Sequence, residues 1–173
     1  MVGTHLRKTI SHLKRDRHFV ATGLVVHDSL DKVLLIKHKK LKTWLPPGGH
    51  VDEGELPDEC VIREVFEETG LIVEIISEAF DVSHEKVETL HTPLLVQLEK
   101  IESLDSEHQH VDLQYLCKVI GGELNASANE EHDEARWFNE NELKAFQELQ
   151  ADVRENAFKA LDKARELRKR GSF

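Results

Sequence analysis

The sequence predicts a single α/β domain, and three observations lead to this prediction. Segments patterned as β-strands alternate with segments that have the apolar periodicity of helices. The chain has 173 residues and is 39% hydrophobic, and one domain of this size buries about 70% of the surface of its unfolded chain. No repeat or low-complexity segment divides it. We therefore expect residues 1–173 to form one domain.

The expected elements follow one another along the whole chain. A polar N-terminal helix is predicted within residues 1–16, and an acidic helix over residues 57–69. Strands are predicted from apolar alternation bounded by turn residues, at 19–27, 33–38, 72–80, 93–101, 111–120 and 134–139. Two C-terminal helices are predicted within residues 140–173, over 140–148 and 150–170.

The acidic helix is the most informative element, because its two ends and its two sides are recognisable. Pro57 suits the first helical position, and Gly70 is placed to take the left-handed conformation that ends helices. An apolar stripe for packing is formed by Val61, Ile62, Val65 and Phe66. Leu56 is a weak start signal, so we expect the preceding loop of two prolines and two glycines to set how the chain enters the helix.

Carboxylates gather on the opposite side of this helix. Glu64, Glu67 and Glu68 stand at i, i+3 and i+4, so a helix stacks them within reach of one ion. Residues 52–68 contain eight acidic residues and one basic residue, Arg63, and a hard cation with oxygen ligands would remove this repulsion. An ordinary solvated helix needs no glycines in register, and the alternating loop ligands of an EF-hand are missing.

The segment from Gly49 to Leu71 resembles the signature box of the Nudix hydrolases. Nine positions agree at the spacing of that box, namely Gly49, Glu55, Arg63, Glu64, Val65, Glu67, Glu68, Gly70 and Leu71. The resemblance implies an α/β/α sandwich with a mixed sheet. It also implies a metal-dependent hydrolase of nucleoside diphosphates that are linked to another group, using Mg²⁺ or Mn²⁺. The Leu56-Pro57 helix start departs from the more usual polar one.

The same resemblance suggests roles for individual residues. It makes Glu67 and Glu68 metal ligands, adds the carbonyl of Gly48, and makes Glu64 either a ligand or the general base. The other candidates for the general base are three later acids, Glu130, Glu131 and Glu134. Glu131 is also placed like an extra metal ligand of some relatives, or else it is a loop acid facing water.

Two charged residues beside the ligands are expected to act indirectly. Arg63 cannot bind a cation, but its guanidinium can orient neighbouring carboxylates and offset their repulsion. Glu55 precedes the helix and either positions water or supports the glycine loop. A purely structural role is the alternative for both residues.

The candidate substrate contacts come from two other segments. Lys39 belongs to a group of lysines that either attracts a polyphosphate or forms a soluble basic turn, and Trp44 either stacks on a base or packs beneath the loop. His108, His110 and Asp112 alternate, so a strand would place them on one face as lining of a cleft. Zinc is an alternative for the two histidines, but no third ligand stands at a recognisable spacing.

Composition limits the partners and the cellular location. A net charge of −10 argues against duplex nucleic acid, whose affinity comes mainly from Lys and Arg. The two cysteines, Cys60 and Cys117, lie in apolar segments and read as buried free thiols of a reducing compartment. No apolar run has the length of a membrane span. We expect a cytoplasmic protein that acts on a small nucleotide derivative, with a homodimer as a possible assembly.

Two functional classes remain open at this point. The first is a Mg²⁺-dependent diphosphohydrolase whose substrate is ADP-ribose-like or a nucleoside triphosphate. The second is a noncatalytic nucleotide-binding or regulatory module on the same fold. Loss of the Arg63-Glu64 or Glu67-Glu68 pair would favour the second class, and both pairs are present.

Overall fold

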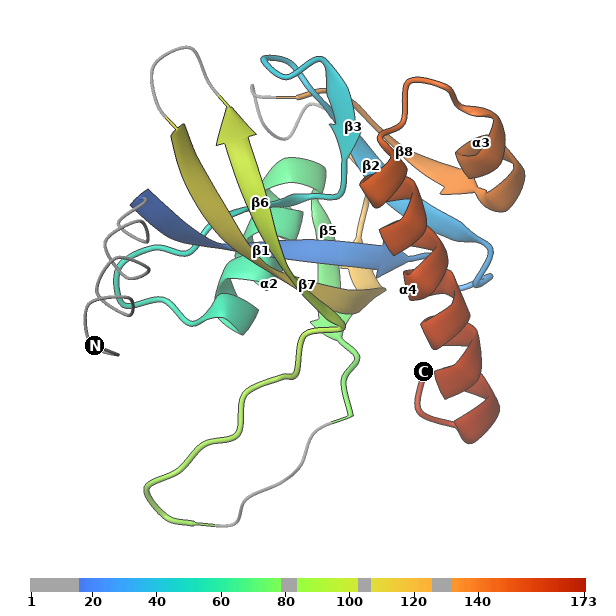
Figure 1. Ribbon diagram of the computed structural model, residues 1–173. Coiled ribbons are helices and arrows are strands. Elements are labelled where there is room, and N and C mark those ends of the chain that lie inside the picture. The colour runs from blue at the N-terminus through green and yellow to red at the C-terminus, as the bar shows by residue number, and fades with distance from the viewer. Residues whose placement is uncertain (1–15, 79–83, 103–106, 126–131) are drawn as a thin grey trace, which may run out of the picture.

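The computed structural model describes residues 16–78, 84–102, 107–125 and 132–173 (Figure 1). In these ranges the strands are β1 (Asp16–Val26), β2 (Lys32–His38), β3 (Thr43–Leu45), β4 (Gly48–His50), β5 (Leu71–Ile75), β6 (Leu95–Glu102), β7 (Glu107–Gly122) and β8 (His132–Asn139). The helices are α2 (Pro57–Thr69), α3 (Glu140–Ala145) and α4 (Ala151–Arg170).

All the strands belong to one mixed sheet, in which β3, β2, β1, β7 and β5 follow one another. Strands β1 and β7 run parallel, in a register that pairs Asp16 with His108 and Val26 with Lys118. The other pairings are antiparallel, with β4 on β1, β6 on β7 and β8 on β2. The long strand β7 is therefore central, because it contacts β1, β5 and β6.

Helices cover both faces of this sheet, as the expected α/β/α sandwich requires. On one face, Val61 and Val65 of α2 pack with Leu34, Tyr115 and other buried side chains of the sheet. On the other face, α3 and α4 contribute Leu143, Leu161 and their neighbours to a second core. The two layers lie on either side of β1 in Figure 1.

Helix α2 begins and ends at the predicted residues. Leu56 has no side-chain cap, but its backbone N–H donates to Glu59 Oε2 at 3.0 Å, which satisfies one of the free amides of the first turn. Gly70 has φ of 73° and donates to the carbonyl of Phe66 at 2.8 Å. The apolar stripe is narrower than expected, because Ile62 and Phe66 are 38% and 53% exposed.

The close packing of α2 on the sheet depends on a glycine. Gly23 lies on β1 beneath the helix, and a Cβ atom added there would stand 2.6 Å from Val65 Cγ2 and 3.4 Å from Val61 Cγ2. The absence of a side chain at this position sets how near the acidic helix lies to β1.

The structure corrects several predicted boundaries. Residues 1–15 of the predicted N-terminal helix lie outside the described residues, and Asp16 begins β1 instead of ending a helix. Strand β7 extends beyond the predicted residues 111–120. The prediction is too short because the first residues of the strand are polar and lack the apolar alternation by which strands are recognised. The short strands β3 and β4 were missed, since three residues are too few for a periodicity.

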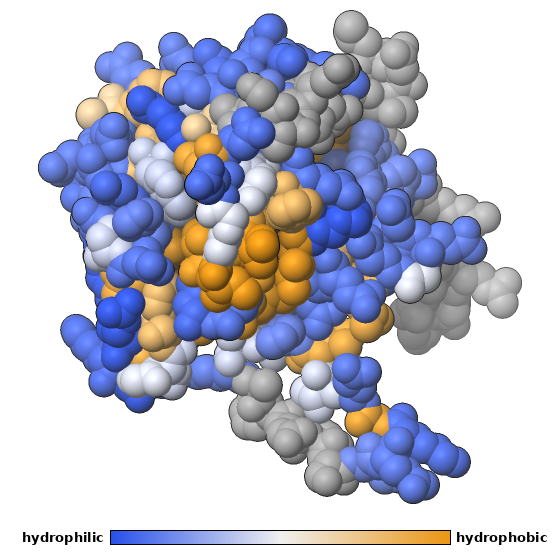
Figure 2. Space-filling view, turned by 180° about the vertical axis from the view of Figure 1, so that it is seen from behind, coloured by the Kyte–Doolittle hydropathy of each residue, from blue (hydrophilic) through white to orange (hydrophobic). Residues whose placement is uncertain are grey.

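The molecular surface is mostly hydrophilic. Figure 2 shows the face opposite to the view of Figure 1, where one apolar area is surrounded by hydrophilic side chains. Both cysteines are buried and free, and burial raises the pKa of each thiol to about 12. No helix of the described ranges is both long enough and apolar enough to cross a membrane.

We predict that Gly23→Ala destabilises the protein, because the added methyl group must push α2 away from the sheet. The expected loss in the free energy of unfolding is about 1–3 kcal/mol, measured by urea denaturation. Gly121→Ala is the matched control, since a Cβ at that strand position would meet no atom closer than 3.7 Å. Equal losses in the two variants would show that Gly23 is not needed for the packing of α2.

Candidate active site

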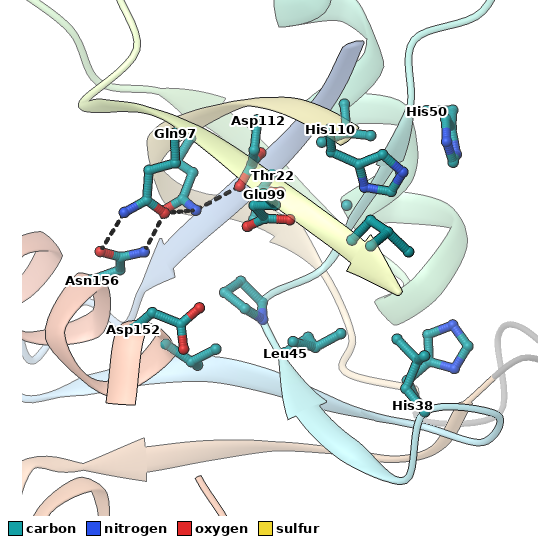
Figure 3. A pocket seen from close by; sticks show the side chains of 18 of the residues that line it. Thr22, His38, Leu45, His50, Gln97, Glu99, His110, Asp112, Asp152 and Asn156 are labelled. Carbon is teal, nitrogen blue, oxygen red and sulfur yellow. Dashed lines mark hydrogen bonds between the residues drawn. The ribbon is translucent and has the colours of Figure 1, made fainter. Parts of the chain in front are cut away.

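A pocket of about 990 Å³ lies at the end of the sheet where β4 meets α2. One part of its wall comes from the glycine loop and α2, through Gly48, Gly49, Glu64 and Glu68. The opposite part comes from β6, β7 and α4, whose polar side chains point into the pocket in Figure 3. This volume is at the upper end of the range for small-molecule sites.

Arg63 holds the carboxylates around the beginning of α2. Its Nε atom is 2.7 Å from Glu55 Oε1, and its Nη2 atom is 2.9 Å from Glu55 Oε2, so the pair is bidentate. Its Nη1 atom donates to Glu64 at 2.8 Å and to Glu67 at 3.2 Å, while Nη2 also donates to the carbonyl of His50 at 3.3 Å. Arg63 thus links α2 to the loop and to β4.

The strong pairing with Arg63 changes the acidity of Glu55. Hydrogen bonds from Arg63 lower the pKa of this carboxyl from 4.5 to about 2. Glu55 Oε2 also accepts from the backbone N–H of Asp52 at 3.0 Å. Glu55 therefore anchors Arg63 and closes the turn before α2. It does not line the pocket.

Glu68 is the most buried of the motif glutamates, with 5% exposure. Its Oε2 atom accepts from the backbone N–H of Gly48 at 2.8 Å, and its Oε1 atom lies 2.6 Å from His132 Nε2. These contacts fix the carboxylate between the glycine loop and β8. His132 was not anticipated from the sequence, because it is a single polar residue at the start of β8 without a motif of its own.

Glu64 stands directly against Gly49. A Cβ atom at Gly49 would overlap the Glu64 carboxylate, so a side chain at this position of the loop would displace that carboxylate. Burial raises the pKa of Glu64, with further contributions from Glu68 and Glu67, and the hydrogen bond from Arg63 opposes this shift only in part. The site therefore carries negative charge that Arg63 does not fully compensate.

The donor set is suitable for a hard divalent cation. It consists of carboxylates and a glycine loop, which supply only oxygen ligands. Glu64, Glu68 and Gly48 line the pocket, whereas the Glu67 side chain is 52% exposed beside Arg63. Among the described residues, a group of three histidines has ligand atoms that all lie within 4.8 Å of one another. The carboxylate oxygens of Glu64, Glu67 and Glu68 do not form such a group. Arg63, His132 and Gly48 hold the glutamates instead.

The pocket wall is strongly acidic beyond the motif. The acidic lining residues are Asp52, Glu64, Glu68, Glu99, Asp112 and Asp152, against one basic residue, Lys100. Burial raises the pKa of Glu99 to about 7, and the neighbouring Asp112 and Asp152 contribute to this shift. A phosphorylated ligand would meet electrostatic repulsion in this pocket unless cations accompany it.

A hydrogen-bonded polar network forms the wall opposite the glutamates. Gln97 Oε1 accepts from Gln114 Nε2 at 3.0 Å and from Asn156 Nδ2 at 2.9 Å. Gln114 Nε2 also donates to Asp112 Oδ2 at 2.5 Å (Figure 3). Asp112 Oδ1 and Gln114 Oε1 are buried and have no hydrogen bond of good geometry from the described residues. These two acceptors therefore lie behind the exposed surface of the wall.

The predicted face of β7 is present, and it is larger than the sequence indicated. His110 and Asp112 line the pocket, and Tyr115 lies in the core on the opposite face with 2% exposure. Gln97, Gln114 and Asn156 were missed, because amides carry no motif and Asn156 comes from α4. His108 shares this face of β7 but does not line the pocket.

Of the two roles predicted for Trp44, the structure agrees with packing and not with stacking on a base. Its side chain is 3% exposed, and its ring lies 4.9 Å from Phe138 and 6.2 Å from Phe146 between ring centroids. The alternative of packing therefore holds, since no face of the indole is open for stacking. Lys39 is an exposed residue of the turn after β2 and does not line the pocket.

The candidates for the general base differ in whether they line the pocket. Glu130 and Glu131 lie outside the described residues. Glu134 is exposed on β8, where it pairs with Lys37 of β2 in the strand register, and it does not line the pocket. Of the proposed bases that the structure describes, Glu64 is the one at the pocket wall.

We predict that Glu55→Gln loses stability in a pH-dependent way. The pKa of Glu55 is lowered in the folded state, so its contribution is complete above about pH 4.5 and disappears as the pH falls toward 2. Urea denaturation between pH 7 and pH 2 should show wild type more stable at neutral pH, with the difference vanishing in acid. A difference that stays constant over this range would mean that the ion pair with Arg63 contributes nothing.

Comparisons with known proteins agree with this site and fold. The family model described as "NUDIX domain" matches residues 17–161. A hydrolase of the NUDIX family from Clostridium perfringens is 32% identical in sequence, and its crystal structure superposes with a TM-score of 0.73 over 86% of this chain and 99% of that chain. An ADP-ribose pyrophosphatase of Methanocaldococcus jannaschii is 30% identical over 137 residues, which are 76% of this chain and 70% of that protein.

The match to a third similar protein covers a smaller share of both chains. The "Probable DHNTP pyrophosphohydrolase" of Lactococcus lactis subsp. cremoris is 31% identical over 105 residues, which are 60% of this chain and 55% of that protein. The chain thus spans about half the length of this relative. The family match includes the glycine loop, α2 and every residue of the pocket wall. The chain belongs to the NUDIX family.

Proposed function

We propose that this protein is a Mg²⁺-dependent diphosphohydrolase that cleaves the diphosphate linkage of a nucleotide derivative by attack of water at phosphorus. The observation that carries the proposal is the arrangement of one pocket between two unlike walls. Fixed carboxylates of α2 stand at one wall, and hydrogen-bond acceptors of β7 and its neighbours stand at the other. Family membership supports the reaction class.

Glu64, Glu67, Glu68 and the carbonyl of Gly48 are the proposed holders of the cation, and Mn²⁺ is expected to replace Mg²⁺. When bound, such cations neutralise phosphate oxygens and make water a stronger nucleophile. The six acidic residues of the pocket wall give a physical reason for the requirement, because a diphosphate cannot approach them without added positive charge. The ligand set consists of oxygens, so Zn²⁺ should be a poor substitute.

The protein side chains have distinct roles in this proposal. Arg63 is a positioning residue, since it orients Glu64 and Glu67 and is itself held by Glu55. Gly48 orients Glu68 through its backbone N–H. Glu64 stands at the pocket wall, where it serves either as a ligand of the cation or as the general base.

The acceptor wall is the proposed binding site for the nucleoside part of the substrate. The wall is lined by Gln97, Asp112, Gln114 and Asn156, whose carboxylate and amide oxygens suit amino groups of a base or hydroxyl groups of a ribose, which are donors. The Methanocaldococcus relative is named for ADP-ribose and the Lactococcus relative for DHNTP. The first name supports ADP-ribose-like compounds as one substrate class to compare, and nucleoside triphosphates are kept as the other.

A noncatalytic nucleotide-binding module is the second candidate function. It has the same pocket, but it does not need every motif position. Here Arg63, Glu64, Glu67 and Glu68 are all present, and Arg63 contacts Glu64 and Glu67 directly. The complete set favours the enzyme. A homodimer and a cytoplasmic location remain predictions.

We predict turnover of at least one nucleoside diphosphate derivative when Mg²⁺ is present. The measurement is release of phosphate after phosphatase coupling, across ADP-ribose, sugar nucleotides, dinucleotides and nucleoside triphosphates, with and without EDTA. Glu68→Gln and Glu67→Gln should each lower kcat at least about a hundredfold, because each replaces an anionic ligand by a neutral amide.

Glu53→Gln is the charge-matched control for these variants, since Glu53 is exposed and lies outside the pocket wall. It should keep the activity of wild type. Turnover that is insensitive to EDTA, or folded Glu68→Gln protein with nearly full activity, would overturn the ligand assignment. Tight nucleotide binding without turnover of any compound would favour the noncatalytic module.

A further inference from the structure

Four histidines from three strands gather at one end of the sheet. His18 lies on β1, His50 on β4, and His108 and His110 on β7. The parallel register pairs His18 directly with His110, and β4 pairs with β1 so that His50 stands opposite Val20. Regular strands therefore hold all four side chains in place.

The imidazole rings are close enough to share one ion. One ring nitrogen from each of His18, His108 and His110 can be chosen so that all three lie within 4.8 Å of one another. The Nε2 atoms of His108 and His110 are already 3.1 Å apart. Two nitrogen ligands of a tetrahedral zinc ion stand about 3.3 Å apart, because each Zn–N bond is about 2.0–2.1 Å long. Only the third ring needs a small shift.

The fourth histidine, His50, lies beside this group. The ring centroid of His50 lies 4.8 Å from that of His110 and 5.3 Å from that of His18. Figure 3 shows His50 and His110 side by side at one end of the pocket. His50 is thus near enough to limit access to the ion or to approach it, but the three other histidines form the ligand group.

Two carboxylates stand beside the rings. The charged groups beside the rings are Asp16, whose Oδ1 is 3.2 Å from His18 Nε2, and Glu99, which pairs with His110 in the register of β6 and β7.

We propose that His18, His108 and His110 form a binding site for a borderline divalent transition-metal ion, with Zn²⁺ as its representative, separate from the carboxylate site on α2. Imidazole nitrogen is the preferred ligand of Zn²⁺, Co²⁺ and Ni²⁺, whereas Mg²⁺ prefers oxygen. The two sites therefore differ in ligand type and select different ions. This inference does not depend on the proposed hydrolase function.

Only two of the three proposed ligands can be recognised from the sequence alone. The His-X-His pair on β7 has a recognisable spacing, but His18 lies 90 residues before His108. Only the parallel pairing of β1 with β7 brings it to the same face. No third ligand stands near the His-X-His pair in the sequence, but the fold brings His18 to it.

The test is a titration of the full-length protein with Zn²⁺ by isothermal titration calorimetry, in a large excess of Mg²⁺ that occupies the carboxylate site. Wild type should bind one Zn²⁺ with a dissociation constant in the micromolar range or tighter. His18→Gln, His108→Gln and His110→Gln should each weaken this binding at least tenfold. His84→Gln is the control, because His84 is exposed in the loop before β6, and it should bind as wild type does.

Co²⁺ provides a second measurement that reports on the ligands themselves. The visible absorption of bound Co²⁺ should show a tetrahedral nitrogen-rich site in wild type and in His84→Gln, and it should be lost in His108→Gln. Circular dichroism identifies any variant that fails to fold, and the remaining two variants then decide. Millimolar binding by wild type, or equal Zn²⁺ affinity in the folded cluster variants and His84→Gln, would overturn the proposal.

Discussion

Repulsion among the carboxylates of α2 is the constraint on which the rest of the site depends. Glu64, Glu67 and Glu68 share one side of a short helix, and the pocket beside them is lined by further acids. Arg63 counters this repulsion by holding Glu55, Glu64 and Glu67 at once. Since one guanidinium cannot neutralise so many carboxylates, the site remains suited to a cation.

The sheet gives this charged site a fixed position. Gly23 lets α2 lie close to β1, and the backbone of Gly48 on β4 binds Glu68 from the same side. The long strand β7 then carries Asp112 and Gln114 across the pocket from the glutamates. The wall with the motif glutamates and the wall with Asp112 and Gln114 thus belong to one sheet and the helix that covers it, which sets their separation.

Local signals explain how much could be predicted from the sequence. Helix α2 runs over the predicted residues 57–69, because Pro57 and Gly70 mark its ends and act within a single turn. The pairing of Arg63 with Glu67 also follows from the i, i+4 spacing of a helix. Its contact with the adjacent Glu64 does not follow from that spacing. His132 and Asn156 belong to segments that reach the pocket only through tertiary packing, and no local pattern identifies them.

Other errors have the same physical origin. The sequence around Trp44 does not show whether its side chain is exposed or buried. The packing of Phe138 and Phe146 against its ring decides between the two. The histidine cluster depends on the register of two strands that are distant in the chain. Its third ligand could be found only after that register was known.

The most direct test of the central claim is to measure whether a divalent cation relieves the repulsion on α2. Thermal unfolding should be followed at rising Mg²⁺ concentration for wild type and for Glu68→Gln. An ion that binds only the folded protein raises its melting temperature, so we expect a saturable rise in wild type that is largely lost in Glu68→Gln. No Mg²⁺-dependent rise in wild type, or an equal rise in both proteins, would contradict the account.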